Sequence, residues 1–391
     1  MEPGIHKSIN HPWLAEFRQQ ENANLSASPF RPWFDAGSGK VLDVGQRLRL
    51  PQLARTLQRL AESAEPVQEF YRGAIGRRLA REILDHGGWV TGEDLASYRV
   101  RLADAEQFPI SPQLSLYTLG APSGGPAVAM NLALNQQLID RPPKTWSELT
   151  AAFHHLIENM KFTYGHWRHM EDNPQSLRQI SAAWDWSEYD WPGPGSVEPA
   201  AEGRGGTAHI SVVDSEGNAV AATSSINYYF GSRAVSPSTG IIWNNHMADF
   251  SYPEPASSTS LNVSNGWGRG KRPRSSQSPV ILLKEGRPYL VSGASGGSKI
   301  LSSVTLVLSR LLYLNETLKE ATDAGRFFNI LRDKGIEAEP HFPEALKREL
   351  EKLGHAFVPW RGRSIVQTIR VGNGSLQAQC DYRKGGHPAG Y

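Results

Sequence analysis

A β-hairpin is predicted in the middle of the chain, where β-branched and polar residues alternate. Its first strand covers 207–213, its return strand covers 219–225, and a polar turn centred on Glu216 joins them. With that turn, Thr207 lies opposite Ser225, and their Cα atoms are about 4.5–5.5 Å apart. A register shift of one residue would change this pairing. The pattern therefore predicts two hydroxyl groups that face each other at the open end of the hairpin.

Apolar residues that recur at helical spacing predict helices on both sides of this hairpin. The predicted helices cover 50–61, 67–84, 126–139, 146–164, 300–312, 318–328 and 343–353. Runs rich in β-branched residues between turn signals predict further strands. These strands cover 115–119, 240–243, 278–283, 288–292, 364–371 and 375–381. Strands before and after a block of helices favour an α+β fold in which helices cover two antiparallel sheets.

The composition is that of an ordinary globular protein, and it excludes several classes of partner. The 391 residues are enough for one large domain or two ordinary ones. A net charge of +2, from 41 basic and 39 acidic residues, gives no reason to expect nucleic acid or an acidic membrane surface. The single cysteine, Cys380, excludes an internal disulfide. No apolar run approaches the roughly 20 residues of a membrane span, and residues 1–17 lack the pattern of a signal peptide.

The segment Gly205-Gly206-Thr207 suggests a nucleophile that activates itself. If the chain breaks between Gly206 and Thr207, the threonine gains an α-amine with a pKa of roughly 7.7–8.0, which can act as the base for its own hydroxyl. The β-methyl group restricts the orientations of that hydroxyl. Glycines before the bond allow the strained backbone that self-cleavage needs. Because Gly-Gly-Thr often opens a strand, the alternative is a plain strand threonine.

Two other clusters invite a ligand-binding interpretation, but a structural interpretation is favoured for both. His154, His155 and Glu158 share one predicted helix, and their spacing is not that of a zinc-binding helix, so packing or polar surface is favoured over a metal site. The aromatic residues within 184–191 are predicted to pin a loop onto the body. The Pro/Gly-rich stretch 192–206 is predicted to be a linker that leads to the scission point.

Several ordered motifs give the chain a resemblance to the γ-glutamyltransferase (γ-glutamyl transpeptidase) family, especially its animal branch. They are RLPQLARTL at 49–57, GGWVTGEDLASYRV at 87–100, GGTAHISVVDSEGNAV at 205–220, TSSIN at 223–227, NNHMADFS at 244–251, PRSSQSP at 273–279, SGASGGSKI at 292–300 and DYRKGGHPAGY at 381–391. The resemblance covers the chain from about Arg47 onward, with a poorly matching patch between Asn173 and Arg204. It implies a four-layer αββα sandwich of the N-terminal-nucleophile hydrolase type.

The resemblance also implies a reaction. Thr207 would first cleave the chain after Gly206 and then attack the γ-glutamyl carbonyl of glutathione or a similar amide. The γ-glutamyl group would pass to water, an amino acid or a dipeptide, and no cofactor is implied. Residues 1–206 would form a large-subunit portion and residues 207–391 the small catalytic subunit. The two products would stay together as a heterodimer within one structural domain.

Site residues follow from the same motifs, position by position. Ser225 stands where the family commonly has a threonine that hydrogen-bonds the nucleophile. Asn227 matches the residue that binds the glutamyl carboxylate, and Asp249 matches one of two acidic residues that hold the substrate's α-ammonium group. The residues that match the remaining substrate contacts are Ser275 and Ser276, for the α-carboxylate, and Gly296 and Gly297, for the oxyanion hole. One oxyanion-hole N–H donor is typically worth about 2.7–4 kcal/mol.

Two departures from the family pattern put full activity in doubt. His246 occupies the position of the second acidic residue, and a protonated histidine would repel the substrate's ammonium group, so weaker γ-glutamyl binding is expected. Only about 50 residues precede the RLPQLARTL motif, so the chain looks truncated at its N-terminus. Relatives carry there an anchor or signal and an arginine that clamps the α-carboxylate.

Two alternatives to an active γ-glutamyltransferase remain open. The first is a catalytically impaired or inactive homologue that serves as a binding or decoy protein. The second is an N-terminal-nucleophile amidase for another acyl group, such as a cephalosporin-type acylase, although Asp249, Ser275 and Ser276 argue against it. The resemblance implies an extracellular or cell-surface location, where four sequons would be glycosylation acceptors. These sequons lie at Asn24, Asn262, Asn315 and Asn373.

Overall fold

The computed structural model describes residues 30–35, 37–43, 45–167, 169–172, 205–251, 265–329, 335–372 and 374–391. The chain forms two compact units, Met1–Asp104 with Phe230–Asn244 and Ala105–Tyr229 with Asn245–Tyr391. All the candidate site residues belong to the second, larger unit. The predicted aromatic cluster at 184–191, the linker up to residue 204, and the sequons at Asn24, Asn262 and Asn373 lie outside the described residues.

The smaller unit contains five short helices among its described residues, together with an aromatic cluster. Its helices are η1 (Arg31–Trp33), α3 (Pro51–Glu62), α4 (Pro66–Tyr71), α5 (Ala74–Asp85) and α6 (Gly92–Ser97). A proline begins α3 and α4, at a position where its missing N–H group has no intrahelical partner to lose. Phe30, Trp33, Phe34 and Val235 form one buried apolar cluster of this unit. The strand predicted over 240–243 is wrong, because only a single bridge forms there, between Val235 and Ile242.

The single helix predicted over 67–84 is also wrong, because two helices, α4 and α5, occupy this stretch. The break falls at Gly73, whose N–H group donates to the Gln68 carbonyl at 2.8 Å. A side chain at Gly73 would lie 2.5 Å from the Glu69 carbonyl oxygen, so glycine is needed for this turn. Both flanking segments keep a helical period, and periodicity alone therefore does not reveal the break.

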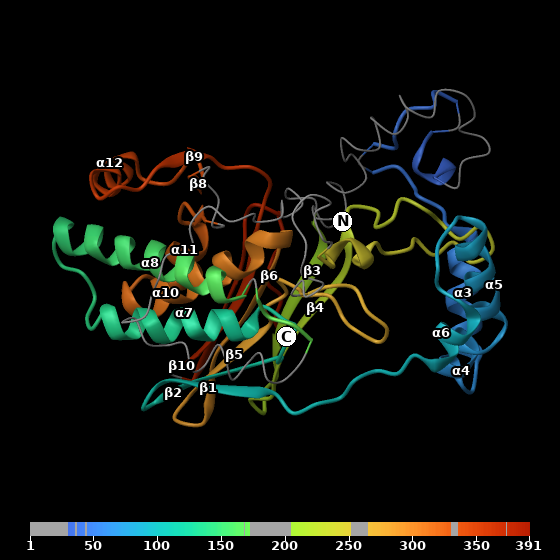
Figure 1. Cartoon of the computed structure of the whole chain (residues 1–391), viewed down its shortest axis with the longest axis horizontal. Coiled ribbons are helices and arrows are strands. Elements are labelled where there is room, and N and C mark those ends of the chain that lie inside the picture. The colour runs from blue at the N-terminus through green and yellow to red at the C-terminus, as the bar shows by residue number, and fades with distance from the viewer. Residues whose placement is uncertain are drawn as a thin grey trace, which may run out of the picture. The chain divides into compact units, whose positions relative to one another are not determined.

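The larger unit contains a six-stranded sheet in the order β1-β2-β5-β6-β10-β11 (Figure 1). Its strands are β1 (Glu106–Ser111), β2 (Leu114–Thr118), β5 (Val280–Lys284), β6 (Arg287–Ser295), β10 (Ile365–Gly372) and β11 (Ser375–Cys380). Every neighbouring pair is antiparallel. The sequence predicted all of these strands except β1, whose two polar first residues and proline hide its β-period.

The predicted hairpin is confirmed, with β3 (Gly205–Val213) paired to β4 (Ala219–Tyr228) and Thr207 opposite Ser225. The hairpin lies against β6 and β10 of the six-stranded sheet. His209 of β3 packs on Gly293 of β6, where a Cβ atom would lie 2.2 Å from the imidazole ring. Ser211 Oγ donates to the Gln367 carbonyl at 3.2 Å. These contacts fix which face of β3 points inward, and with it the side of the hairpin on which Thr207 lies.

Helices cover the other face of the six-stranded sheet. They are α7 (Gly125–Leu138), α8 (Trp146–Trp167) and α10 (Ile300–Tyr313), shown on one side of β6 in Figure 1. Leu290 and Ala294 of β6 belong to the apolar core that includes these helices, whereas Gly293 faces the hairpin. Because side chains alternate along β6, one face of the strand packs against the helices and the other faces the hairpin. The predicted α+β fold with helices over antiparallel strands is confirmed.

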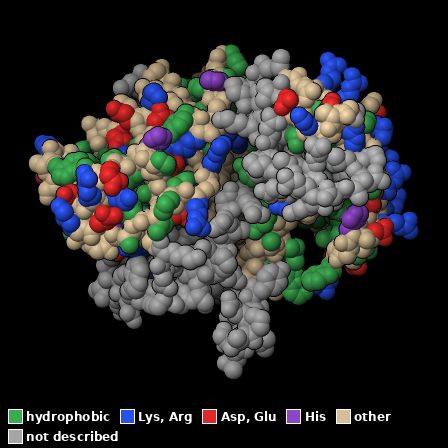
Figure 2. Space-filling model, turned by 90° about the horizontal axis from the view of Figure 1, so that it is seen from above, with side chains coloured by type: hydrophobic (Ala, Val, Ile, Leu, Met, Phe, Trp, Pro, Cys, Tyr) green, Lys and Arg blue, Asp and Glu red, His purple; other side chains and the backbone are tan. Residues whose placement is uncertain are grey.

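A small peripheral lobe completes the larger unit. It contains α11 (Leu318–Asp323), β7 (Phe327–Phe328), β8 (Ile336–Ala338), α12 (Glu344–Lys352) and β9 (Phe357–Pro359). The helix predicted over 318–328 is wrong beyond Asp323, because the chain there becomes extended to bury Arg326, whose guanidinium donates to Asp381 Oδ2 at 2.6 Å. On the visible faces of the described residues, Figure 2 shows acidic and basic side chains intermixed, in keeping with the near-zero net charge.

Candidate active site

The predicted nucleophile and its predicted partner are in direct contact. Thr207 Oγ1 lies 2.8 Å from Ser225 Oγ, and both side chains are half-buried. The Ser225 hydroxyl also accepts a hydrogen bond from the backbone N–H of Asn227 at 2.8 Å. Since a hydroxyl has one proton and two lone pairs, this contact leaves Ser225 able to donate to Thr207 or to accept from it. Ser225 is therefore fixed in an orientation that holds the Thr207 hydroxyl.

The residue before Thr207 has no room for a side chain. A Cβ atom at Gly206 would lie 2.4 Å from the Tyr228 carbonyl oxygen. The strand register also shifts between Gly205 and Thr207, which marks a local irregularity of the β-bulge kind. The glycine at the predicted scission point is thus required by the packing of the hairpin, quite apart from any chemistry.

Asn227 connects the end of β4 to Asp249. Its side-chain amide donates to Asp249 Oδ1 at 2.9 Å and to the Asn245 carbonyl at 3.2 Å. Its backbone φ is 70°, a left-handed conformation that asparagine tolerates better than most residues. Asp249 ends the short helix η3 (His246–Asp249), so the predicted α-ammonium ligand lies beside the predicted carboxylate ligand.

His246, which occupies the position of the second acidic residue, is hydrogen-bonded to Asp249. Its Nδ1 lies 3.0 Å from Asp249 Oδ2, and its Nε2 lies 3.2 Å from the Ser225 carbonyl. Both neighbours are acceptors, so the imidazolium, with two N–H donors, satisfies both. The hydrogen bond to Asp249 raises the pKa of His246, burial opposes it, and the Ser225 carbonyl adds to the rise. A positive charge is thus favoured at the place where the family has a second negative one.

Asn265 is a residue that sequence reasoning missed. It is buried, and its side-chain amide donates to the Asp249 carbonyl at 2.7 Å while its Oδ1 accepts from the Arg274 N–H at 2.6 Å. The asparagine therefore ties Asp249 to the segment that carries Ser275 and Ser276. Nothing in the local pattern distinguished it from the polar residues around it.

Ser275 and Ser276 are themselves anchored on the turn before α7. The Ser275 N–H group donates to the Pro122 carbonyl at 2.9 Å, and the Ser276 carbonyl accepts from Ser278 Oγ at 2.9 Å. A Cβ atom at Gly124 would lie 3.0 Å from the Ser276 carbonyl oxygen. The glycine in this turn thus permits the close approach of the serine segment.

Gly296 and Gly297 form the turn between β6 and the short helix η4 (Gly297–Lys299). Their φ angles are 132° and 61°, and a Cβ atom at Gly296 would lie 2.5 Å from the Arg363 carbonyl oxygen. Only glycine fits such a conformation without strain. Because η4 contacts β3, the predicted oxyanion-hole turn is next to the strand that contains the predicted nucleophile.

Side chains that the sequence did not single out hold this turn in place. Lys299 is buried, its Nζ lies 2.7 Å from Glu337 Oε2, and its ammonium group lies 3.9 Å from the Phe328 ring centroid. Tyr164 Oη donates to the Ser298 carbonyl at 3.0 Å. Burial raises the pKa of Tyr164, which keeps this donor protonated. The hydrogen bond to the Ser298 carbonyl and the ion pair of Lys299 therefore hold the two residues that follow Gly297.

His209 is a further residue near the site that sequence reasoning passed over. Its Nδ1 lies 2.8 Å from Thr223 Oγ1 and its Nε2 lies 3.1 Å from Ser211 Oγ. Burial lowers the pKa of His209 to about 4, so the ring is neutral at physiological pH. It fixes the hairpin two residues after Thr207.

The structure therefore gathers the predicted residues into one region of the larger unit. One hydrogen-bonded network joins Thr207, Ser225, Asn227, His246 and Asp249. Asn265 links this network to the segment that contains the two serines, and η4 lies against β3. A sequence profile described as "Gamma-glutamyltranspeptidase" matches residues 9–391. The chain belongs to the γ-glutamyltranspeptidase family.

Members of this family are similar to the chain over most of its length. It is 32% identical to "Scoloptoxin SSD14" of Scolopendra dehaani, covering 94% of this chain and 67% of the relative. It is 31% identical to "Glutathione hydrolase proenzyme 1" of Schizosaccharomyces pombe, covering 96% of this chain and 63% of the relative. The chain thus spans about two thirds of the length of these γ-glutamyltranspeptidase relatives.

The fold of this γ-glutamyltranspeptidase family member also matches a solved structure of another enzyme. The crystal structure of cephalosporin acylase from Bacillus halodurans superposes with a TM-score of 0.78 at 22% identity, covering 97% of this chain and 71% of that one. This likeness concerns the fold alone, and it agrees with the α+β arrangement of helices over antiparallel strands. Among the residues that the structure describes, no helix has both the length and the apolar character to cross a membrane.

Proposed function

We propose that this chain is a self-processing γ-glutamyltransferase and glutathione hydrolase with Thr207 as its nucleophile. The observation that carries the proposal is the 2.8 Å contact between Thr207 Oγ1 and Ser225 Oγ. Thr207 lies near the start of β3 and directly follows Gly206, which has no room for a side chain. Family membership and relatives named glutathione hydrolases support the choice of substrate. Glutathione and related γ-glutamyl amides are the proposed donors, and water, amino acids or dipeptides are the proposed acceptors.

Maturation begins with an attack of Thr207 Oγ1 on the Gly206 carbonyl carbon. The Thr207 amide nitrogen leaves and takes up a proton, so the Gly206 acyl group moves from nitrogen to oxygen as an ester. Water then hydrolyses this ester, which releases the Gly206 carboxylate and restores the Thr207 hydroxyl. The new α-amine is the base that later accepts the proton of that hydroxyl. Ser225 orients Oγ1 in both steps.

Turnover uses the same hydroxyl on a second carbonyl. Oγ1 attacks the γ-glutamyl carbonyl carbon while the α-amine takes its proton, and the N–H groups of Gly296 and Gly297 stabilise the oxyanion. Collapse of this intermediate expels the amine of the donor with a proton and leaves a γ-glutamyl ester on Thr207. Water or an acceptor amine attacks the ester and frees the threonine. Lys299 and Tyr164 act as positioning residues, because they fix the turn that follows Gly297.

Substrate binding is proposed to use the network around Asp249. Asp249 would receive the α-ammonium group, and Asn227, Ser275 and Ser276 would bind the α-carboxylate. His246 competes for Asp249 Oδ2, so weak substrate binding is expected. The alternative of an impaired or inactive homologue that serves as a binding protein is not favoured, because the similar relatives include proteins named glutathione hydrolases. A secreted or cell-surface location is proposed from the family resemblance.

Cleavage would leave a tightly associated pair of fragments, residues 1–206 and 207–391. Strand β2 comes before the cleavage point and β5 comes after it, and the two strands are hydrogen-bonded neighbours in one sheet. Their paired residues Leu116 and Leu282 are fully buried. Because separation would expose this shared core, we propose a heterodimer in which both fragments contribute strands to the sheet of the larger unit.

The test is the intact mass of the purified protein under denaturing conditions. The wild type is expected to give two fragments that meet at Gly206–Thr207, and Thr207→Ala is expected to remain one chain. Ser225→Ala should slow cleavage, whereas the matched control Ser224→Ala, an exposed residue on the opposite face of β4, should not. Processed protein is then assayed with a γ-glutamyl anilide. An uncut wild-type chain would refute self-processing, and a cut but inactive chain would favour the binding protein.

A further inference from the structure

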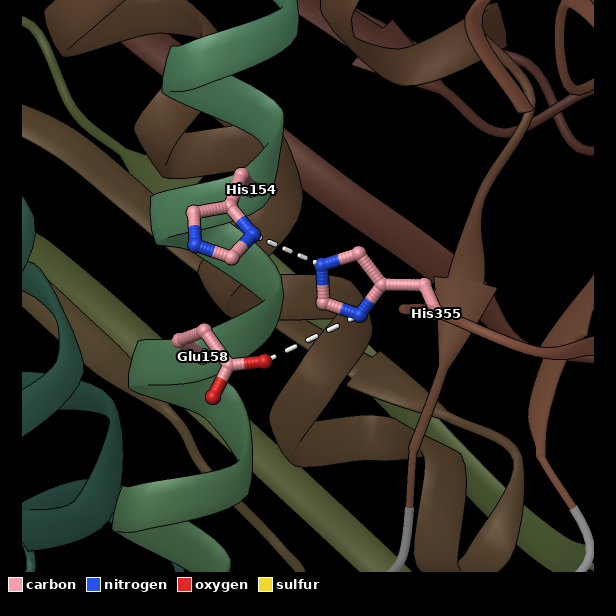
Figure 3. A group of neighbouring side chains, drawn as sticks. All are labelled: His154, Glu158 and His355. Atoms are coloured by element: carbon pink, nitrogen blue, oxygen red, sulfur yellow. Dashed lines mark hydrogen bonds and ion pairs between the residues drawn. The ribbon is translucent and has the colours of Figure 1, made fainter. Parts of the chain in front are cut away.

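Three metal-ligating side chains from distant parts of the sequence meet in the larger unit, and none of them belongs to the Thr207 network. His154 and Glu158 lie one turn apart on α8, and His355 comes from the loop after α12 (Figure 3). His154 Nδ1 lies 2.8 Å from His355 Nε2, and Glu158 Oε1 lies 3.7 Å from His355 Nδ1. One ligand atom from each of the three residues lies within 4.8 Å of the other two.

The cluster has a fixed backbone. The His355 side chain is only 2% exposed, and the His355 N–H group donates to the Leu350 carbonyl at the end of α12. The preceding Gly354 has a φ of 91°, which turns the chain so that the histidine points back at α8. Figure 3 shows the three side chains converging between the helix and this loop. The hydrogen bond to Leu350 and the turn at Gly354 therefore hold His355 in its buried position.

We propose that His154, Glu158 and His355 bind a divalent transition metal ion of the zinc class. Two imidazole nitrogens and one carboxylate oxygen are a common ligand set for Zn²⁺, with the fourth position left to water. Zn–N bonds of roughly 2.0–2.1 Å at a tetrahedral angle place two nitrogens roughly 3.3 Å apart. The two rings have to separate by about half an ångström from their present contact. The proton that now lies between the two nitrogens moves to the other nitrogen of the imidazole that carries it, because both facing nitrogens become ligands.

Lys161 is the cation that a metal must displace. Its Nζ lies 2.7 Å from Glu158 Oε1 and 3.3 Å from His355 Nδ1. A metal ion next to this ammonium group is disfavoured, so Lys161 has to turn away as the ion binds. The structure therefore predicts that removing this positive charge strengthens metal binding.

The site has a further consequence that rests on the proposed self-cleavage. His154 and Glu158 precede the Gly206–Thr207 bond, whereas His355 follows it. After cleavage the metal would be bound by both fragments and would hold them together. A site of this kind stabilises the heterodimer by its binding free energy, as any ligand of the folded state does.

The experiment is equilibrium dialysis of the full-length protein against Zn²⁺ after treatment with a chelator, followed by metal analysis. The wild type is expected to retain one ion per chain. His154→Gln, Glu158→Gln and His355→Gln are each expected to lose it. The matched control is His155→Gln, because His155 neighbours His154 on α8 but is no member of the cluster. Lys161→Met should bind Zn²⁺ more tightly than the wild type. Zn²⁺ should also raise the melting temperature of the wild type and not that of His154→Gln.

Two outcomes overturn the site. These are a wild type that retains no Zn²⁺, and retention that is equal in the wild type and His154→Gln. Thr207→Ala, which keeps the chain whole, separates this inference from the proposed function. Zn²⁺ binding by Thr207→Ala supports the site whether or not the wild type is cleaved. If a cleaved wild type binds Zn²⁺ but its fragments part equally readily in denaturant with and without the ion, the bridging role is refuted.

Discussion

Replacing His246 with glutamate is the change that most directly tests how the site binds substrate. The substitution removes the group that now occupies Asp249 Oδ2, at 3.0 Å, and restores the second carboxylate that the family places here. In the free protein, two carboxylates three residues apart on η3 repel each other, and a bound α-ammonium group relieves that repulsion. The Michaelis constant for a γ-glutamyl substrate is therefore expected to fall.

The size of the effect follows from the new hydrogen bond between the glutamate and the substrate's ammonium group. A hydrogen bond to a charged group contributes about 1.5–3 kcal/mol, which corresponds to a factor of roughly 10 to 150 in affinity. The His246 and Asp249 side chains are 34% and 29% exposed, so solvent weakens charge interactions at this position. The lower end of the range applies, and the Michaelis constant should fall about tenfold.

The assay compares kcat and KM for a γ-glutamyl anilide in the wild type, His246→Glu and His246→Gln. Complete cleavage of each variant is first checked by mass. The neutral glutamine is the control, and its KM should lie between those of the other two. Raising the pH should also lower the KM of the wild type, because His246 loses its positive charge above its raised pKa and no longer repels the substrate's ammonium group. An unchanged KM in fully cleaved His246→Glu would refute the role given to His246.

Four further predictions concern processing, catalysis and stability. Gly206→Ala should slow self-cleavage severely, seen as uncut chain by mass, because its Cβ would lie 2.4 Å from a carbonyl oxygen. Lys299→Met should lower kcat more than KM in the anilide assay, since it loosens the turn after Gly297. Asp381→Asn should lower the free energy of unfolding by about 3–5 kcal/mol in a denaturant titration, because it leaves the buried Arg326 guanidinium without its carboxylate. Because the folded pKa of His209, about 4, is below its unfolded value, stability should fall as the pH drops from about 6.5 towards 4, and His209→Gln should flatten this dependence in pH-dependent melting.

The hairpin and the identity of the residues around it could be predicted from the sequence. Alternation along β3 and β4 and a polar turn were enough to set the pairing of Thr207 with Ser225, because strand register is fixed by a short-range period and a turn. The motifs around Asn227, Asp249 and Gly296 placed the chain in its family, since each is contiguous in sequence. Helix breaks such as the one at Gly73 were missed, because the period continues across them.

Only the folded chain shows which distant residues support these motifs. Asn265 and Tyr164 carry no local signal, and Lys299 lies in a family-like motif that gave it no role of its own. Each of the three is held by a contact with another element. His246 and Asp249 were both predicted to contact the substrate, and in the structure they are hydrogen-bonded to each other. His355 meets His154 across 201 residues of sequence. Periodicity and spacing report only on neighbours within a few turns, so contacts that depend on how strands and helices pack can be known only from the tertiary structure.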